Sequence, residues 1–114
     1  MLAEARQAPQ AVADQLAHNA DDYRDFGAVV RLQNPAAVLT VARGSSDHAA
    51  HFLAYLVMAR MGRLVTSLPM SLITLYQSQI ACKGLVSLAF SQSGQSPDLV
   101  APTRFFSDGG AITA

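Results

Sequence analysis

Apolar side chains along the first third of the chain recur at helical spacing. Residues 2 to about 33 carry them with aspartate and arginine in between, which predicts one or two packing helices. Pro9 can open a helix, and Gly27 is a possible weak point within the segment. Asn34-Pro35 then breaks the pattern.

Short apolar runs follow this segment and predict strands. Residues 37–42 and 85–90 are almost wholly apolar, as is typical of strands buried on both faces of a sheet. Residues 63–67 predict a shorter strand, and residues 71–78 a weaker segment that can form a helical turn. Residues 111–114 have the pattern of a strand that begins.

A long helix is predicted between the first two strands. Ser46 or Asp47 is expected to cap its N-terminus, and it should run to about Met61. Gly62 can take the left-handed conformation that commonly ends a helix. Most faces of this helix are apolar, which indicates burial under a sheet or in a subunit interface.

A further helix is predicted after the strand at residues 85–90. Ser96 is a suitable N-cap, and Pro97 suits the first helical position, where a missing N–H costs nothing. Asp98 puts negative charge in the first turn, as the helix dipole favours. The helix is expected to run to about Ser107.

Alternating strands and helices predict an α/β fold. The expected architecture is a three-layer αβα sandwich with a parallel sheet, of the flavodoxin-like nucleotide-binding type. Residues 1–35 are expected to form an N-terminal helical segment and residues 36–114 the α/β domain. A strand that begins near Ala111 should have further neighbours, so we expect the sheet to be incomplete at the C-terminus.

Composition and charge narrow the classes of function. The 114 residues are 51% hydrophobic and 14% charged, enough apolar material for a packed core. Eight basic and eight acidic residues cancel without a basic cluster, which argues against nucleic-acid binding. Cys82 is the only cysteine, so no disulfide framework is expected. With no signal-peptide pattern and no apolar run that could span a membrane, a cytoplasmic protein is predicted.

Two serine-rich turns stand where predicted strands end and helices begin. Gly44-Ser45-Ser46 follows the first strand, and the segment from Ser91 to Ser96 follows the strand at residues 85–90. Capping alone accounts for one hydroxyl per helix, and for a single turn it is the simpler interpretation. Five serine hydroxyls and an amide exceed that need. Because helix N-termini and hydroxyls bind anions, the pair predicts a phosphate site.

The residues of both turns resemble a known family. Ala42-Arg-Gly-Ser-Ser-Asp-His-Ala49 and Ser91-Gln-Ser-Gly-Gln-Ser-Pro-Asp98 are similar to the two signature turns of the SIS (sugar isomerase) domain. The similarity is greatest to the isomerase half of glucosamine-6-phosphate synthase and to SIS-type glucosamine-6-phosphate deaminases. It implies a ligand such as glucosamine-6-phosphate or fructose-6-phosphate, bound without a cofactor or metal.

The resemblance also implies roles for residues at matching positions. The residues expected to hold the phosphate are Ser46, Ser91, Gln92, Ser93 and Ser96. Gly44 and Ser45 are expected to line the sugar. Arg43 departs from the Cys or Gly common before the first turn, and it either supplements the phosphate site or faces solvent.

Enzymes of this family carry two SIS domains and usually pair as dimers. Their glutamate, histidine and lysine acid–base residues lie largely in the second domain. The resemblance therefore implies the first domain of an isomerase, deaminase or transaminase-type enzyme. No catalytic residue is assigned to this chain, which is expected to be inactive alone and to bind the phosphate weakly at best. Two alternatives stay open: a sugar-phosphate-sensing SIS domain of a transcriptional regulator, and a flavodoxin-like fold whose serines merely cap helices.

Other candidate chemistry is weaker. His48 and His51 are spaced i, i+3 and could share a metal, but no third ligand is obvious nearby. Ser46, Asp47 and His48 are the residue types of a catalytic triad, yet consecutive helical positions do not face one another. The sequence has neither a Gly-x-Gly-x-x-Gly dinucleotide motif nor a P-loop.

Overall fold

The computed structural model describes residues 2–114, which form two units. The first unit ends at Gln33 and consists of helices α1 (Leu2–His18) and α2 (Ala20–Gln33). The predicted helical segment is confirmed, although α1 runs through Pro9 and the break between the helices falls at Asn19. Gly27 lies inside α2 and does not interrupt it, although a glycine in a helix costs about 1 kcal/mol of stability relative to alanine. No helix in the described part of the chain has both the length and the apolar character needed to cross a bilayer.

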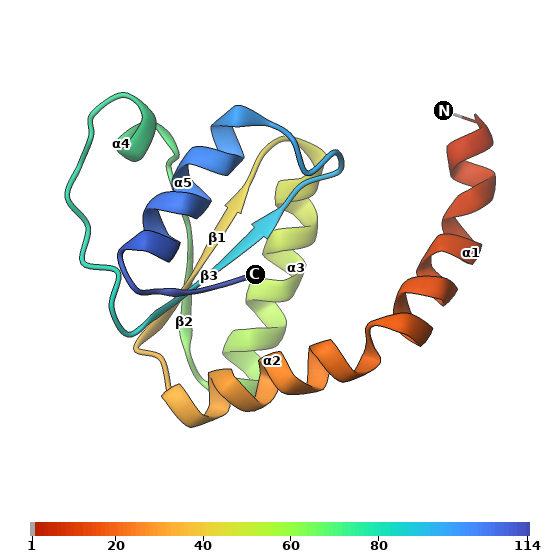
Figure 1. Ribbon diagram of the computed structural model, residues 1–114, viewed down its shortest axis with the longest axis horizontal. Helices are drawn as coiled ribbons and strands as arrows, with labels where there is room; N and C mark the ends of the chain where they lie inside the picture. The colour runs from red at the N-terminus through yellow and green to blue at the C-terminus, as the bar shows by residue number, and fades with distance from the viewer. Residues whose placement is uncertain (1) are drawn as a thin grey trace. The chain divides into compact units, whose positions relative to one another are not determined.

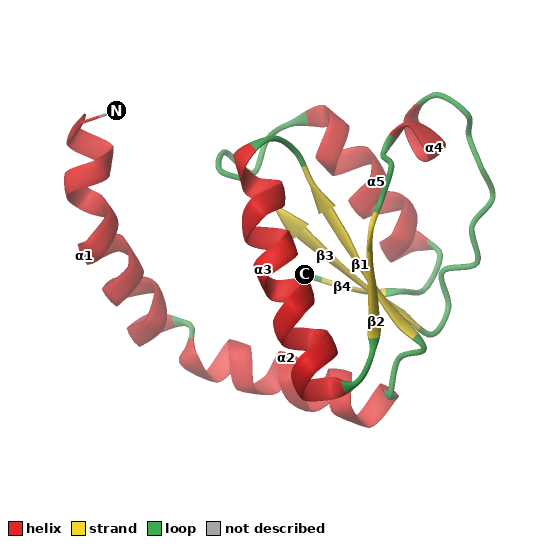
Figure 2. Cartoon of the chain, turned by 180° about the vertical axis from the view of Figure 1, so that it is seen from behind, coloured by secondary structure: helices red, strands yellow, loops and turns green. Residues whose placement is uncertain are grey.

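The second unit, Asn34–Ala114, is a three-layer α/β structure. Its four strands are all parallel and lie in the order β2-β1-β3-β4. Helix α3 covers one face of this sheet and helix α5 the other (Figures 1 and 2). The strands are β1 (Ala37–Ala42), β2 (Leu64–Ser67), β3 (Leu85–Phe90) and β4 (Ile112–Thr113), and the helices are α3 (Ser45–Met61), α4 (Ser71–Thr74) and α5 (Pro97–Asp108). The predicted α/β fold with a parallel sheet is confirmed.

The main core lies between the sheet and α5. Leu39 and Val41 of β1 pack there with Leu99 and Phe106 of α5. Because strand side chains alternate between faces, Val38 and its even-numbered neighbours face the opposite side, where α3 lies. Both faces of β1 are buried, and burial on both faces explains why its sequence is a continuous apolar run.

The N-terminus of α3 differs from the prediction. The helix begins at Ser45, with Gly44 at the N-cap, so the prediction that Ser46 or Asp47 caps it is wrong. Gly44 has φ 58° and ψ −131°, a conformation that side-chain-bearing residues rarely adopt, and this turns the chain into the helix earlier. The C-terminus agrees with the prediction, because Gly62 is left-handed and its N–H donates to the Met58 carbonyl oxygen.

Cys82 is part of the core between the sheet and α5. Its side chain is buried in the cluster that contains Phe106, and its Sγ donates to the Ile80 carbonyl oxygen at 3.2 Å. Burial raises the pKa of the Cys82 thiol, because the thiolate would lose its hydration. A raised pKa keeps the thiol protonated and unreactive, which fits a structural role.

Candidate functional site

The two serine turns lie at one edge of the sheet. Strand β1 leads into α3 on one face, whereas its neighbour β3 leads into α5 on the other face. Ala42 pairs with Phe90 in the register, so the turns that start at Arg43 and Ser91 leave the sheet at the same level. Such a switch point, where adjacent strands send their connections to opposite faces, is where open α/β sheets bind ligands.

One cavity brings the two turns together. It has a volume of about 390 Å³, and we call it the serine cavity. Leu99 contributes an apolar part of its wall and Arg43 a cationic part. The remaining lining residues are the seven that the sequence singled out: Gly44, Ser45, Ser46, Ser91, Gln92, Ser93 and Ser96. What the cavity binds stays a prediction.

Hydrogen bonds inside the second turn determine whether two of its hydroxyls donate or accept toward a ligand. The Gly94 N–H donates to Ser91 Oγ at 2.9 Å, and the Gln95 N–H donates to Ser93 Oγ at 3.3 Å. A serine oxygen that accepts a backbone N–H still has its own proton to donate. Both hydroxyls are therefore arranged to donate, as an anionic ligand requires.

The Ser96 hydroxyl is not occupied by capping. Ser96 stands at the N-cap of α5 as predicted, but its side chain makes no capping hydrogen bond within residues 2–114. The backbone carbonyl of Ser96 instead accepts from the N–H groups of Leu99 and Val100, at 2.9 and 3.0 Å. The hydroxyl is left at the rim of the serine cavity, beside the N-terminus of a 12-residue helix.

An ion pair connects the two turns. Arg43 Nη1 donates to Asp98 Oδ2, which links the residue after β1 to the first turn of α5. Sequence reasoning left the role of Arg43 open and gave Asp98 only an interaction with the helix dipole. The pair was missed because its members are 55 positions apart in the chain.

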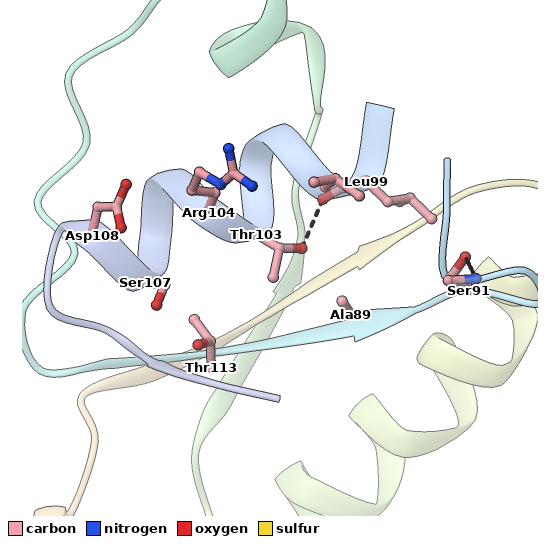
Figure 3. Close-up of a pocket in the computed structure, with 10 residues that line it drawn as sticks. Ala89, Ser91, Leu99, Thr103, Arg104, Ser107, Asp108 and Thr113 are labelled. Carbon is pink, nitrogen blue, oxygen red and sulfur yellow. Dashed lines mark hydrogen bonds between the residues drawn. The ribbon is translucent and has the colours of Figure 1, made fainter. Parts of the chain in front are cut away.

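A second cavity borders the serine cavity and shares Ser91 and Leu99 with it. It has a volume of about 600 Å³ and lies between α5 and strands β3 and β4 (Figure 3). Ser107 and Thr113 lie on opposite sides of it, while the Thr103 hydroxyl donates to the Leu99 carbonyl oxygen at 2.7 Å. We call this space the α5 cavity. Most of its polar residues lie on the outer turns of α5, where polar side chains are ordinary, so no local pattern singled them out.

The two histidines of α3 do not assemble a metal site in the structure. His51 Nδ1 lies 2.8 Å from the Asp47 carbonyl oxygen, a contact within one helical turn. Across residues 2–114, no three His, Cys, Asp or Glu side chains lie close enough together to hold a metal ion.

Comparison with solved structures finds similar chains. The chain is similar to a protein of Silicibacter pomeroyi DSS-3 described as a "putative phosphosugar isomerase", with a TM-score of 0.87 and 42% sequence identity. This chain shares its fold with that protein. The similarity covers 94% of this chain and 33% of the Silicibacter chain, so this chain spans about a third of that protein's length. No family model and no curated protein matches the chain.

The similarity extends beyond the α/β unit. Helices α1 and α2 account for 31 of the 114 residues, 17 plus 14, whereas only 6% of the chain lies outside the similarity to the Silicibacter protein. Most of this helical segment therefore has a counterpart there. The helical segment is thus shared with the Silicibacter protein and does not single this chain out as a transcriptional regulator.

Proposed function

We propose that this chain is the sugar-phosphate-binding part of an SIS-type enzyme that isomerises or deaminates an amino-sugar phosphate. Glucosamine-6-phosphate and fructose-6-phosphate are the expected kinds of ligand. The observation that carries the proposal is the meeting of both serine turns around the serine cavity, at the switch point of the sheet. The 42% identity to the Silicibacter protein supports it.

The donors around the serine cavity suit a phosphate monoester. Ser91 and Ser93 can each donate a proton to a phosphate oxygen, with Ser46, Ser96 and Gln92 as further donors on the rim. The N-termini of α3 and α5 add partial positive charge at the same place. Gly44 and Ser45 stand on the α3 side, where the sugar would extend from the phosphate.

In the proposed enzyme this chain binds the substrate, and another part of the whole protein carries out proton transfer. Residues 36–114 form the first SIS domain in this proposal, and a second SIS domain of the whole protein supplies the acid–base residues. In the whole enzyme a base moves a proton between C1 and C2 of the opened sugar, which interconverts the aldose and ketose forms. No catalytic residue is assigned to this chain.

Titration with matched ligands tests the proposed function. We expect the chain to bind glucosamine-6-phosphate and to bind glucosamine at least about tenfold more weakly, because the phosphate accounts for most of the hydrogen bonds. Isothermal titration calorimetry, or ligand-observed NMR for weak binding, measures both affinities. Equal affinity for the two ligands, or no binding of either, would contradict the proposal.

We also propose that the protein pairs as a homodimer through α3. Phe52, Tyr55 and Met58 lie at helical spacing on this helix, and their side chains are 67%, 68% and 43% exposed. Exposed apolar side chains clustered in this way support an interface. Sedimentation velocity should show a dimer that the double substitution Phe52→Ser, Tyr55→Ser converts to a monomer.

A matched control is available at a site away from α3. Leu75 and Tyr76 follow α4 and are 75% and 73% exposed, so the double substitution Leu75→Ser, Tyr76→Ser also removes two large exposed apolar side chains and should leave the dimer intact. A wild-type monomer at all concentrations tested, or a dimer unaffected by the α3 double substitution, would rule this interface out.

A further inference from the structure

We propose that Arg43 is a phosphate-binding residue and that Asp98 forms an ion pair with it when no ligand is bound. In the structure the guanidinium of Arg43 pairs with Asp98, and on ligand binding it exchanges this carboxylate for a phosphate oxygen. The inference rests on the proposed function and adds to it a positively charged residue that controls affinity.

The position of Arg43 allows this exchange. Arg43 lines the serine cavity, together with Ser91 and Ser93. It also lines a neighbouring hollow formed with α4, and Asp98 lines that hollow but not the serine cavity. Asp98 thus holds the guanidinium on the α4 side of the cavity rim, while the backbone of Arg43 belongs to the first serine turn.

Charge favours the phosphate over the resident carboxylate. Asp98 carries one negative charge, whereas a phosphate monoester carries between one and a half and two at neutral pH. Coulomb attraction at equal distance scales with that charge, and a bidentate arginine–phosphate contact adds a second hydrogen bond. The dianion therefore competes well for a guanidinium that it can reach.

Breaking the ion pair costs little free energy, because the side chains of both partners are exposed to water. The side chains of Arg43 and Asp98 are 61% and 55% exposed, so water can solvate the carboxylate once the arginine moves. An ion pair this exposed contributes little to stability. Asp98 also stands in the first turn of α5, where the helix dipole stabilises its negative charge without a partner.

Asp98 lowers the affinity for phosphate in two ways in this account. It occupies Arg43, and from the neighbouring hollow its own charge repels an anion in the serine cavity. Removing the carboxylate while keeping the side chain's shape, as in Asp98→Asn, should therefore tighten binding. Removing the cation, as in Arg43→Gln, should weaken it. A structural role for the pair, in which Asp98 merely positions Arg43, predicts weaker binding for both substitutions.

A double-mutant cycle tests the exchange. The ligands are glucosamine-6-phosphate and inorganic phosphate, titrated into wild type, Arg43→Gln, Asp98→Asn and the double variant. We expect Arg43→Gln to weaken binding at least about tenfold, as for loss of a charge-assisted hydrogen bond. Asp98→Asn should tighten binding at least about threefold in the presence of Arg43, and by less in the Arg43→Gln background, because only direct repulsion is relieved there.

Arg60→Gln is the matched control for the loss of charge. Arg60 lies in the last turn of the 17-residue helix α3, and the turn that contains Arg43 precedes the same helix. A helix of that length separates the two sites by roughly 25 Å, more than two Debye lengths at physiological salt. Affinity should be unchanged in this variant, and thermal denaturation should show that every variant is folded.

The outcomes separate this inference from the proposed function. If substitution of Ser91 and Ser93 weakens binding but Arg43→Gln does not, the exchange is wrong and the serine site stands. Weaker binding by Asp98→Asn, or an equal gain with and without Arg43, would also overturn the exchange. A wild-type chain that binds neither phosphorylated ligand would overturn both.

Discussion

Replacing Ser91 and Ser93 together by alanine is expected to lower the affinity for glucosamine-6-phosphate by about a hundredfold. Each hydroxyl accepts a backbone N–H of its own turn and so has its proton left to donate to the ligand. A hydrogen bond to a charged group is worth about 1.5–3 kcal/mol, and two such losses amount to roughly two factors of ten or more. The affinity is measured by calorimetric titration or by ligand-observed NMR.

Ser107→Ala is the control for this double variant. Ser107 is an exposed serine at the other end of α5 and lines the α5 cavity, not the serine cavity. Its loss should leave the affinity unchanged if the ligand sits in the serine cavity. An unchanged affinity in the Ser91, Ser93 double variant would mean that these serines only shape the turn. A drop in the Ser107 variant instead would place the ligand in the α5 cavity.

Replacing Gly44 by alanine is expected to destabilise the protein by about 1–3 kcal/mol, the usual cost of a strained backbone conformation. Gly44 has φ 58° and ψ −131°, and a Cβ added there would meet no atom within 4 Å. The penalty is therefore conformational and not steric. Because the turn that contains Gly44 sets the position of Ser45 and Ser46, sugar-phosphate affinity should fall as well. Thermal or urea denaturation followed by circular dichroism measures the stability.

Gly27→Ala is a control glycine substitution that is expected to leave the stability of the protein unchanged or to raise it. Gly27 lies inside α2, where alanine is favoured by up to about 1 kcal/mol. The added Cβ would approach only the end of the flexible Arg31 side chain, at 3.3 Å. Stability should be unchanged or higher. A Gly44→Ala variant as stable as wild type would show that the turn tolerates a side chain, against the account of how α3 begins.

The succession of elements follows from the sequence because each has a local cause. Residues 37–42 and 85–90 are apolar on both faces, and Gly62 ends α3 by its left-handed conformation. The order of strands has no such local cause. Strand β4 has only two residues, and it is held to β3 partly by bonds of Ala114 to Ser87 and Ala89, which depend on tertiary contact.

The candidate site could be predicted as far as its residues are neighbours in the chain. Each serine turn is a continuous segment after a strand, so its members are recognisable together, and the fold then brings the two segments to one cavity. The link between Arg43 and Asp98 joins distant segments and could not be read from either. Asp98 already had a sufficient local explanation in the helix dipole.

The central claim is that both serine turns bind one phosphate. It is tested most directly by recording backbone amide NMR signals residue by residue during a titration with glucosamine-6-phosphate. The account predicts that the amides of residues 43–46 and 91–96 shift together, with one common dissociation constant, and that glucosamine without phosphate does not reproduce the shifts. Shifts confined to one turn, or to the residues of the α5 cavity near Ser107 and Thr113, would contradict it.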